Sequence, residues 1–146
     1  MRVVGVDLGT KRIGIAVSDP GGVLATPYEV IARTKDATAH RRRIAAIVAE
    51  EEAGIVVVGL PLSMDGSIGR AASDALAETE ALREVVGVPV ETFDERLTTV
   101  SADRSMIERN MRADARRKVV DKIAAAVMLQ AWLDSREARI PVDRIS

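Results

Sequence analysis

Hydrophobic positions in the first part of the chain predict three successive β-strands. Residues 2–8 are nearly all apolar, which is typical of a strand that is covered on both faces. Residues 12–19 alternate between large and small side chains, so Ile13 and the other large ones would share one face. A third strand is expected over residues 23–32, where Pro27 favours an edge strand or a bulge. Glycine-containing turns separate the three strands, so the pattern predicts an antiparallel meander.

The rest of the chain alternates between helical and strand patterns. We expect helices over residues 37–53, 71–86, 99–110 and 116–135, and strands over residues 55–59 and 88–93. Loops are expected over residues 60–70 and 110–115. Gly54 and Gly87 are expected to end the first two helices, because glycine commonly follows the last helical turn. The order β-β-β-α-β-α-β-α-α predicts an α/β domain with a five-stranded mixed sheet flanked by helices.

The last predicted helix carries an apolar stripe at helical spacing. The residues expected on its buried side are Val120, Ile123, Ala124, Val127 and Ala131. We expect one domain over residues 1–138 and a flexible tail over residues 139–146, since Pro141 interrupts any continuation of the helix.

The amino-acid composition excludes several kinds of catalytic and metal site. The chain has 146 residues and no cysteine, which excludes disulfide scaffolds, zinc–thiolate sites and thiol catalysis. The single histidine, His40, excludes a metal site built from several histidines. No apolar run approaches the roughly 18 residues of a membrane span, and no signal-peptide pattern opens the chain. We therefore expect a soluble cytoplasmic protein that makes no membrane contact.

The net charge of −1, from 21 basic and 22 acidic residues, does not by itself favour binding to nucleic acid. Two local basic clusters keep that possibility open. One is the run of three arginines at 41–43, and the other lies within residues 104–122, where seven basic residues stand among a few acidic ones. Charge alone favours a phosphate-binding patch and an ordinary solvated helix face equally.

Carboxylates at three separate places in the sequence are the candidate catalytic and metal-binding groups. Asp7 lies near the end of the first strand, Asp94 and Glu95 directly follow a later strand, and Asp121 borders the apolar stripe of the last helix. Each has a structural alternative, respectively a turn cap, loop acidity and an ion pair with a neighbouring lysine. If they converge, their mutual repulsion makes sense mainly with divalent cations between them. Oxygen ligands favour Mg²⁺ or Mn²⁺, and two such ions can clamp a phosphodiester displacement.

Two further segments could meet phosphates. The loop at 59–69 follows a buried strand and precedes a helix, which suits anion binding at the helix start, but it lacks the Gly-Lys-Ser/Thr ending of a Walker loop. Lys11 and Arg12 follow Asp7 closely and could contact a phosphate; the alternative is a solvated turn.

Four segments together resemble the signatures of the YqgF/RuvX family. They are residues 7–19 (DLGTKRIGIAVSD), 59–72 (GLP, then MDG and GRAA), 94–99 (DERLTT) and 121–130 (DKIAA, then LQ). The resemblance implies an RNase H-like fold and a metal-dependent endonuclease. Its implied activity is maturation of the 5′ end of precursor 16S rRNA or, as the alternative, resolution of Holliday junctions in DNA recombination.

The same resemblance assigns roles to residues of this chain. It implies that Asp7, Glu95 and Asp121 are the catalytic carboxylates, which hold two Mg²⁺ or Mn²⁺ ions. The choice between Asp94 and Glu95 stays open, because adjacent side chains on extended backbone point in different directions. Substrate phosphates are expected to contact basic residues near the site, namely Lys11, Arg12, Arg96, Arg116 and Arg117.

Other classes of function remain as alternatives. An ATP-using protein of the actin/hexokinase type shares the Asp-Leu-Gly-Thr motif, but it needs a second lobe that this chain does not supply. A non-catalytic module that binds nucleic acid or the ribosome has no need of three clustered carboxylates. For the nuclease, a monomer suffices to process an RNA end, whereas a four-way junction favours a homodimer.

Overall fold

A computed structural model describes residues 1–98 and 113–137; in the second range, side chains are described for residues 123–136. Five strands form one sheet in the order β3-β2-β1-β4-β5. The strands are β1 (Arg2–Leu8), β2 (Arg12–Ser18), β3 (Ala25–Ala32), β4 (Ala53–Leu60) and β5 (Val90–Asp94). The helices are α1 (Ala37–Glu50), α2 (Arg70–Arg83), the one-turn 3₁₀ helix η1 (Glu95–Leu97) and α4 (Ala113–Glu137).

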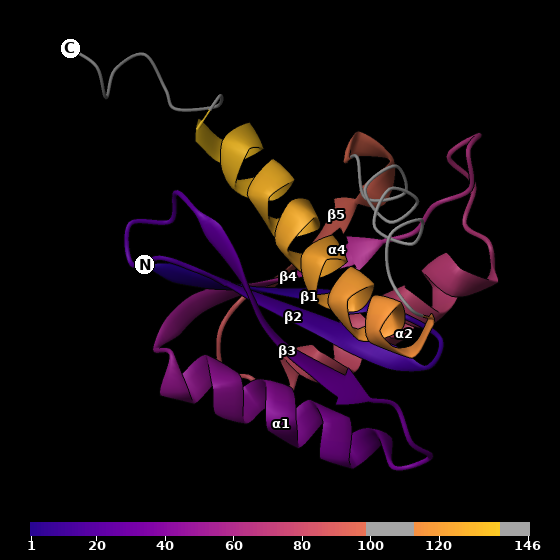
Figure 1. Cartoon of the computed structure of the whole chain (residues 1–146), viewed down its shortest axis with the longest axis horizontal. Helices are drawn as coiled ribbons and strands as arrows, with labels where there is room; N and C mark the ends of the chain where they lie inside the picture. Colours follow the sequence, from indigo (N-terminus) through magenta and orange to yellow (C-terminus); the bar gives the residue numbers. More distant parts are fainter. Residues whose placement is uncertain (99–112, 138–146) are drawn as a thin grey trace.

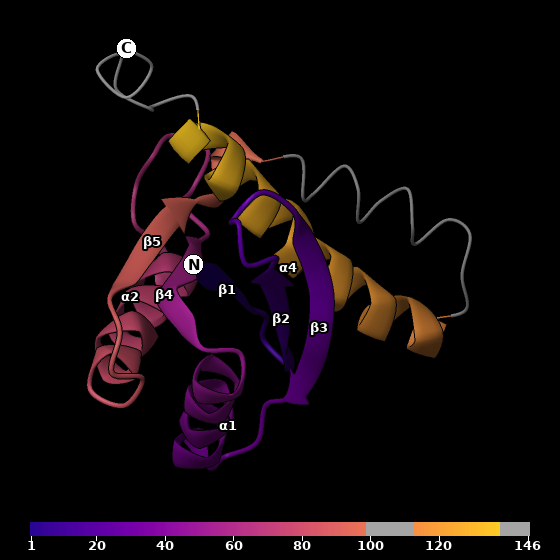
Figure 2. The ribbon, with the colours of Figure 1, turned by 90° about the vertical axis from the view of Figure 1, so that its left-hand side faces the viewer.

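The sheet is mixed, as the order of elements predicts. β1, β2 and β3 form the antiparallel meander, whereas β4 pairs in parallel with β1 and β5 in parallel with β4. Helices α1 and α2 lie on one face and α4 on the other (Figures 1 and 2). The carboxyl ends of β1, β4 and β5 therefore share one edge of the sheet, which we call the carboxyl edge.

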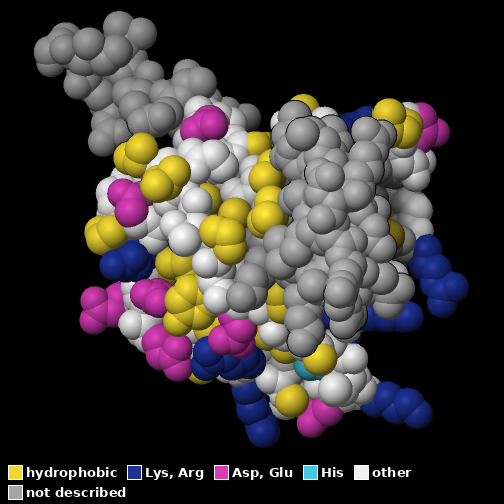
Figure 3. Space-filling view, in the orientation of Figure 1, with side chains coloured by type: hydrophobic (Ala, Val, Ile, Leu, Met, Phe, Trp, Pro, Cys, Tyr) yellow, Lys and Arg dark blue, Asp and Glu magenta, His cyan; other side chains and the backbone are white. Residues whose placement is uncertain are grey.

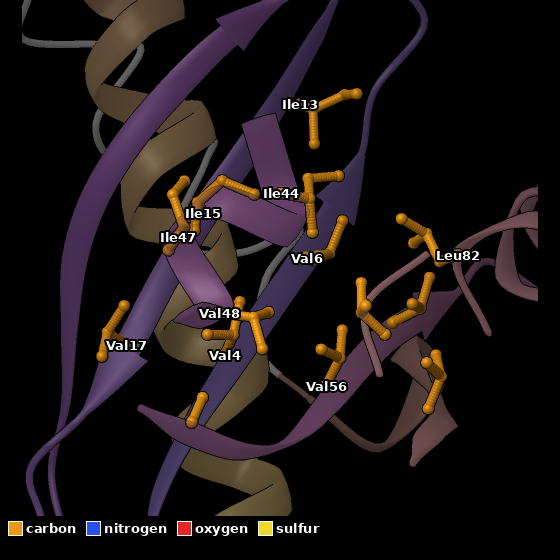
Figure 4. Packing of buried hydrophobic residues seen from close by; sticks show 14 residues of the cluster. Val4, Val6, Ile13, Ile15, Val17, Ile44, Ile47, Val48, Val56 and Leu82 are labelled. Carbon is orange, nitrogen blue, oxygen red and sulfur yellow. The ribbon is translucent and has the colours of Figure 1, made fainter. Parts of the chain in front are cut away.

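A core lies on each face of the sheet, and the alternation along the strands decides which side chain enters which core. Val4 and Val6 of β1 pack with Ile44, Ile47 and other residues of α1 and α2 (Figure 4). The large side chains of β2 enter this same core, as predicted. The odd-numbered positions of β1 instead face α4, where Val3 belongs to the second core.

The edge strand β3 confirms the interpretation of Pro27. This strand is the outermost in the sheet, and the register with β2 shifts so that Ile15 pairs with Glu29 while Ala16 pairs with Pro27. Pro27 therefore lies at a bulge in an edge strand, where its missing N–H does not break the sheet.

The expected end of the first helix is wrong. Helix α1 ends at Glu50, and the left-handed position that follows is occupied by Glu52, with φ of 52°, instead of by Gly54. Gly54 is part of β4, where a Cβ atom would overlap the side chain of Met1. Helix α2 likewise ends before its predicted bound, and Gly87, with φ of 71°, makes the chain reversal after it.

Two expectations for α4 are also corrected. The helix begins at Ala113, so the loop predicted over 110–115 is wrong from that residue onward. The predicted stripe is rotated: Ala124 is buried as predicted, but Ile123, Val127 and Ala131 are only partly buried. The buried positions among the described side chains of α4 are Ala124, Ala125, Ala126, Met128, Leu129, Trp132 and Leu133.

The cause of this rotation lies in the sheet. Hydrophobic side chains occur on several sides of α4, including the side seen in Figure 3, so apolar spacing alone does not define the buried face. Gly5 does define it, because a Cβ atom there would be 2.9 Å from the Cβ atom of Leu129. The helix approaches β1 closely at this glycine.

Some expectations concern parts of the chain that are not described. The helix expected over 99–110, the side chain of Val120 and the tail expected over 139–146 lie outside the described residues. Within the described ranges, no helix combines the length and apolar character needed to cross a bilayer.

Candidate functional site

Asp7 lies near the end of β1 and is buried, with 5% of its surface exposed. It pairs in register with Gly14 of β2. As an odd-numbered position of β1, it lies on the α4 face of the sheet, opposite Val4 and Val6. A buried carboxylate needs hydrogen bonds or a cation around it, so Asp7 is a candidate metal ligand.

Gly59 is the corresponding position of the neighbouring strand. Val6 pairs with Val58, so Asp7 and Gly59 are the next residues along the two strands. Both lie on the α4 face, since Val57, two residues before Gly59, belongs to the core on that side. Neighbouring strands are about 4.8 Å apart, so whatever covers Gly59 lies beside Asp7.

The carboxylate of Glu95 covers Gly59. β5 pairs with β4 up to Leu60 and Asp94, and η1 begins at the next residue. A Cβ atom built on Gly59 would lie 2.5 Å from Oε1 of Glu95 and 3.2 Å from its Cγ. The structure thus brings Asp7 and Glu95, 88 positions apart in sequence, to the same edge and the same face of the sheet.

Asp94 has a different environment from Glu95. Its carboxylate accepts hydrogen bonds from Nη2 of Arg96 at 2.7 Å and from Nε at 3.1 Å. Oδ1 also accepts the backbone N–H of Arg96 at 2.9 Å, which caps η1. The side-chain hydrogen bond from Arg96 is the main reason that the pKa of Asp94 is lowered. The two adjacent carboxylates therefore point to different places. Asp94 pairs with the guanidinium of Arg96, whereas Glu95 lies over Gly59.

Arg96 also holds the loop between β4 and α2. Its Nη1 donates to the backbone carbonyl of Met64 at 3.3 Å, and Gly66, with φ of 87°, passes close to the same guanidinium. Within the loop, Oδ1 of Asp65 accepts hydrogen bonds from the N–H and hydroxyl of Ser67, which lower the pKa of Asp65. The loop thus has a defined shape beside Glu95; its role as an anion site stays a prediction.

The turn after Asp7 carries the first two predicted phosphate contacts. The N–H of Gly9 donates to the carbonyl of Arg12 at 2.9 Å, and the Lys11 side chain is exposed. Arg33 holds this turn: its N–H donates to the carbonyl of Lys11 at 2.9 Å, and its Nη1 donates to the carbonyl of Gly9 at 2.7 Å. Sequence reasoning missed Arg33, because a lone arginine after a strand carries no signal for a partner in a distant turn.

The direction of α4 bears on the third predicted carboxylate. Leu129 lies over Gly5, and Oε1 of Gln130 accepts the N–H of Ala25, at the start of β3, at 2.8 Å. The second half of α4 therefore lies over the strand starts, and its first half extends toward the carboxyl edge (Figure 1). Asp121 belongs to this first half, eight residues before Leu129, or about 12 Å along the helix.

The side chains of Asp121, Arg116 and Arg117 lie outside those described, so their roles remain predictions. Among the described side chains, no group of three His, Cys, Asp or Glu residues comes together. Asp7 and Glu95 both offer carboxylate oxygens as donors. That donor chemistry fits Mg²⁺ or Mn²⁺, which prefer carboxylate and water oxygens.

The arginine run on α1 has structural partners. Arg41 donates to Glu78 of α2 through Nε at 2.6 Å and Nη2 at 3.0 Å. Arg43 donates to Glu29 of β3 through Nη2 at 2.6 Å and Nε at 2.8 Å. Two of the three arginines therefore tie α1 to its neighbours, which favours the structural interpretation of this cluster over a phosphate-binding one.

Comparison with known proteins places the chain in a family. A family model described as "RuvX: Holliday junction resolvase" matches residues 1–135. A protein of Mycobacterium sp. (strain KMS), named "Putative pre-16S rRNA nuclease", is 50% identical over 140 residues, which cover 95% of this chain and 83% of the relative. A relative of the same name from Mycobacterium tuberculosis (strain CDC 1551 / Oshkosh) is 50% identical over 138 residues, or 94% and 81% of the two chains.

Solved structures agree on the fold. The structure of T. thermophilus RuvC in complex with a Holliday junction substrate superposes with a TM-score of 0.60. The match covers 94% of this chain and 96% of RuvC at 18% sequence identity. A likeness at this identity shows a shared fold, which is the RNase H-like fold that the sequence motifs imply.

Proposed function

Because this chain belongs to the RuvX family, we propose that it is a metal-dependent endonuclease that trims the 5′ end of precursor 16S rRNA. The observation that carries the proposal is the meeting of two carboxylates from distant parts of the chain. Asp7 is buried at the carboxyl edge, and Glu95 lies beside it over Gly59. The names of relatives that are 50% identical favour RNA as the substrate.

Asp121 completes the proposed site. Ala125 and Met128, four and seven residues later in α4, are both fully buried, and a helix repeats its faces at these spacings. This periodicity supports Asp121 as the third carboxylate, on the same side of α4. Three carboxylates from β1, η1 and α4 would hold two Mg²⁺ or Mn²⁺ ions. When bound, such ions activate water and stabilise the leaving oxygen in phosphodiester hydrolysis.

The protein's own residues would hold the carboxylates in position and supply positive charge for the substrate phosphates. Burial of Asp7 in the sheet fixes the direction of its carboxylate, and the cap on η1 fixes the backbone of Glu95. Lys11 and Arg12 extend from the turn that Arg33 holds, close to Asp7, where they would contact substrate phosphates. Such contacts place the strand without reading its sequence. Arg96, Arg116 and Arg117 are the further proposed phosphate contacts.

Resolution of Holliday junctions is the second candidate function. The description of the family model and the fold shared with RuvC favour it. A junction resolvase makes two symmetric cuts, so this candidate needs a homodimer, whereas processing of an RNA end needs only a monomer.

Cleavage of two labelled substrates side by side tests both candidates. The purified protein would be incubated with Mn²⁺ or Mg²⁺ and either a 5′-extended 16S rRNA precursor, free and within a precursor ribosomal subunit, or a four-way DNA junction. The Asp7→Asn variant, purified in the same way, controls for contaminating nucleases. Metal-dependent cutting of the RNA by the wild type alone supports the proposal. Cutting of the junction alone supports the second candidate. Binding without cutting of either substrate overturns the nuclease and leaves a binding module.

A further inference from the structure

We propose that Gly59 is a positioning residue, whose missing side chain leaves the space in which the Glu95 carboxylate lies next to Asp7. The position of the carboxylate is a property of the fold, whereas its use in metal binding rests on the proposed function. In this arrangement Gly59 of β4 leaves the space, and Glu95, at the start of η1 directly after β5, supplies the carboxylate.

The close approach accounts for glycine at this position. Gly59 follows three valines in a buried strand, where a side chain would ordinarily be favoured. Its φ does not lie in the left-handed region, where only Gly22, Gly66, Gly87 and Glu52 are found among the described residues. Backbone conformation therefore does not require glycine here. Among the described residues, the three atoms nearest to a Cβ at this position all belong to the Glu95 side chain, at 2.5, 3.1 and 3.2 Å.

The backbone of Glu95 cannot easily retreat from a new methyl group. The Asp94 carboxylate caps η1 from one side. On the other side, the carbonyl of Glu95 accepts hydrogen bonds from the hydroxyl of Thr98 at 2.8 Å and from its N–H at 3.1 Å. A methyl group on Gly59 would therefore be accommodated by rotation of the flexible Glu95 side chain, which moves the carboxylate away from Asp7.

We therefore expect Gly59→Ala to damage the site without damaging the fold. The atoms that must move belong to the end of one side chain, and alanine is favoured over glycine within a strand. In the absence of metal, the melting temperature of the variant should equal or exceed that of the wild type. Its affinity for Mn²⁺ should fall by about 10- to 100-fold, the usual effect of losing a group that orients a metal ligand.

The experiment compares the wild type, Gly59→Ala, Glu95→Gln and the double variant by calorimetric titration with Mn²⁺. Gly69→Ala is the matched control, because within the part of the chain that the structure describes its new methyl group would meet the Ser63 hydroxyl at 3.3 Å and not Glu95. We expect weaker binding in Gly59→Ala, unchanged binding in Gly69→Ala and no additional loss when Gly59→Ala is added to Glu95→Gln. A similar loss in both backgrounds, or no loss in the single variant, would overturn the proposal.

A crystal structure of the metal-free Gly59→Ala variant reads the position of Glu95 without any metal. The proposal expects the carboxylate to be displaced, and it is wrong if the carboxylate stays where it is in the wild type. A wild type that binds no Mn²⁺ would instead contradict the proposed function, while the crystal structure would still decide the role of Gly59.

Discussion

The contact between Gly5 and Leu129 determines how closely α4 approaches the sheet, and the Gly5→Ala variant tests it. The new Cβ atom would lie 2.9 Å from the Cβ of Leu129, 3.3 Å from Cδ2 and 3.4 Å from Cγ. Carbon atoms prefer separations of about 3.5–4.0 Å, so the helix must move outward by roughly 1 Å. Leu129 is completely buried, so no solvent-filled space absorbs this movement.

The loss in the free energy of unfolding of Gly5→Ala can be worked out from the effect of adding methyl groups to a close-packed core. Extra methyl groups in a close-packed interior destabilise by about 1–3 kcal/mol. The reduced freedom of the unfolded chain offsets about 0.4–1 kcal/mol of this. Taking the middle of each range, the net loss in the free energy of unfolding is about 1.3 kcal/mol, which lowers the melting temperature by roughly 4 °C in a chain of this length.

Trp132 provides the assay, because it is the only tryptophan and lies on α4 itself. It is buried, its indole N–H donates to Glu91 at 3.3 Å, and Arg136 stacks over the ring. Thermal unfolding followed by its fluorescence should show a lower melting temperature for Gly5→Ala than for the wild type. A Gly5→Ala variant as stable as the wild type would refute the close packing of α4 on β1.

Three further predictions follow from the charged groups. In Asp7→Asn, Mn²⁺ should raise the melting temperature less than it does in the wild type, because one proposed metal ligand is lost; thermal unfolding with and without Mn²⁺ measures this difference. Replacing Arg41 and Glu78 by alanine, singly and together, should give a coupling of about 1 kcal/mol in urea unfolding that weakens at high salt. Arg96 lowers the pKa of Asp94, so the stabilisation from this pair is present above the ordinary aspartate pKa and is lost as the pH falls through the lowered value. The stability difference between the wild type and Asp94→Asn, measured by urea unfolding, should therefore shrink toward zero in acid and persist at neutral pH.

The sequence predicts the sheet well, because successive side chains of a strand point to opposite faces and their hydrophobicity follows which face is buried. The two faces of β2 follow from the side chains alone, and Pro27 marks both the edge and the bulge. Helix ends and helix faces are less predictable. Gly54 is an obvious helix terminator, yet Glu52 takes the left-handed position, and the face of α4 depends on its contact with Gly5.

The candidate site, like the fold, could be predicted from the sequence only in part. The resemblance indicates an acidic residue at 94–95, but no local pattern tells which of the two carboxylates faces Asp7. That choice depends on Gly59 in another strand and on the guanidinium of Arg96. Contacts between distant segments decide such details, and a single sequence does not record them.

Cleavage assays on variants of the adjacent residues Asp94 and Glu95 decide whether Glu95 is the carboxylate that acts with Asp7. The wild type, Glu95→Gln and Asp94→Asn would be compared on the same labelled substrate at saturating Mn²⁺, with unfolding curves to show that all three are folded. We expect the wild type to cut, Glu95→Gln to fall to the level of a reaction without enzyme, and Asp94→Asn to retain most of the rate. Equal loss in both variants, or full activity in Glu95→Gln, would contradict a site built from Asp7 and Glu95.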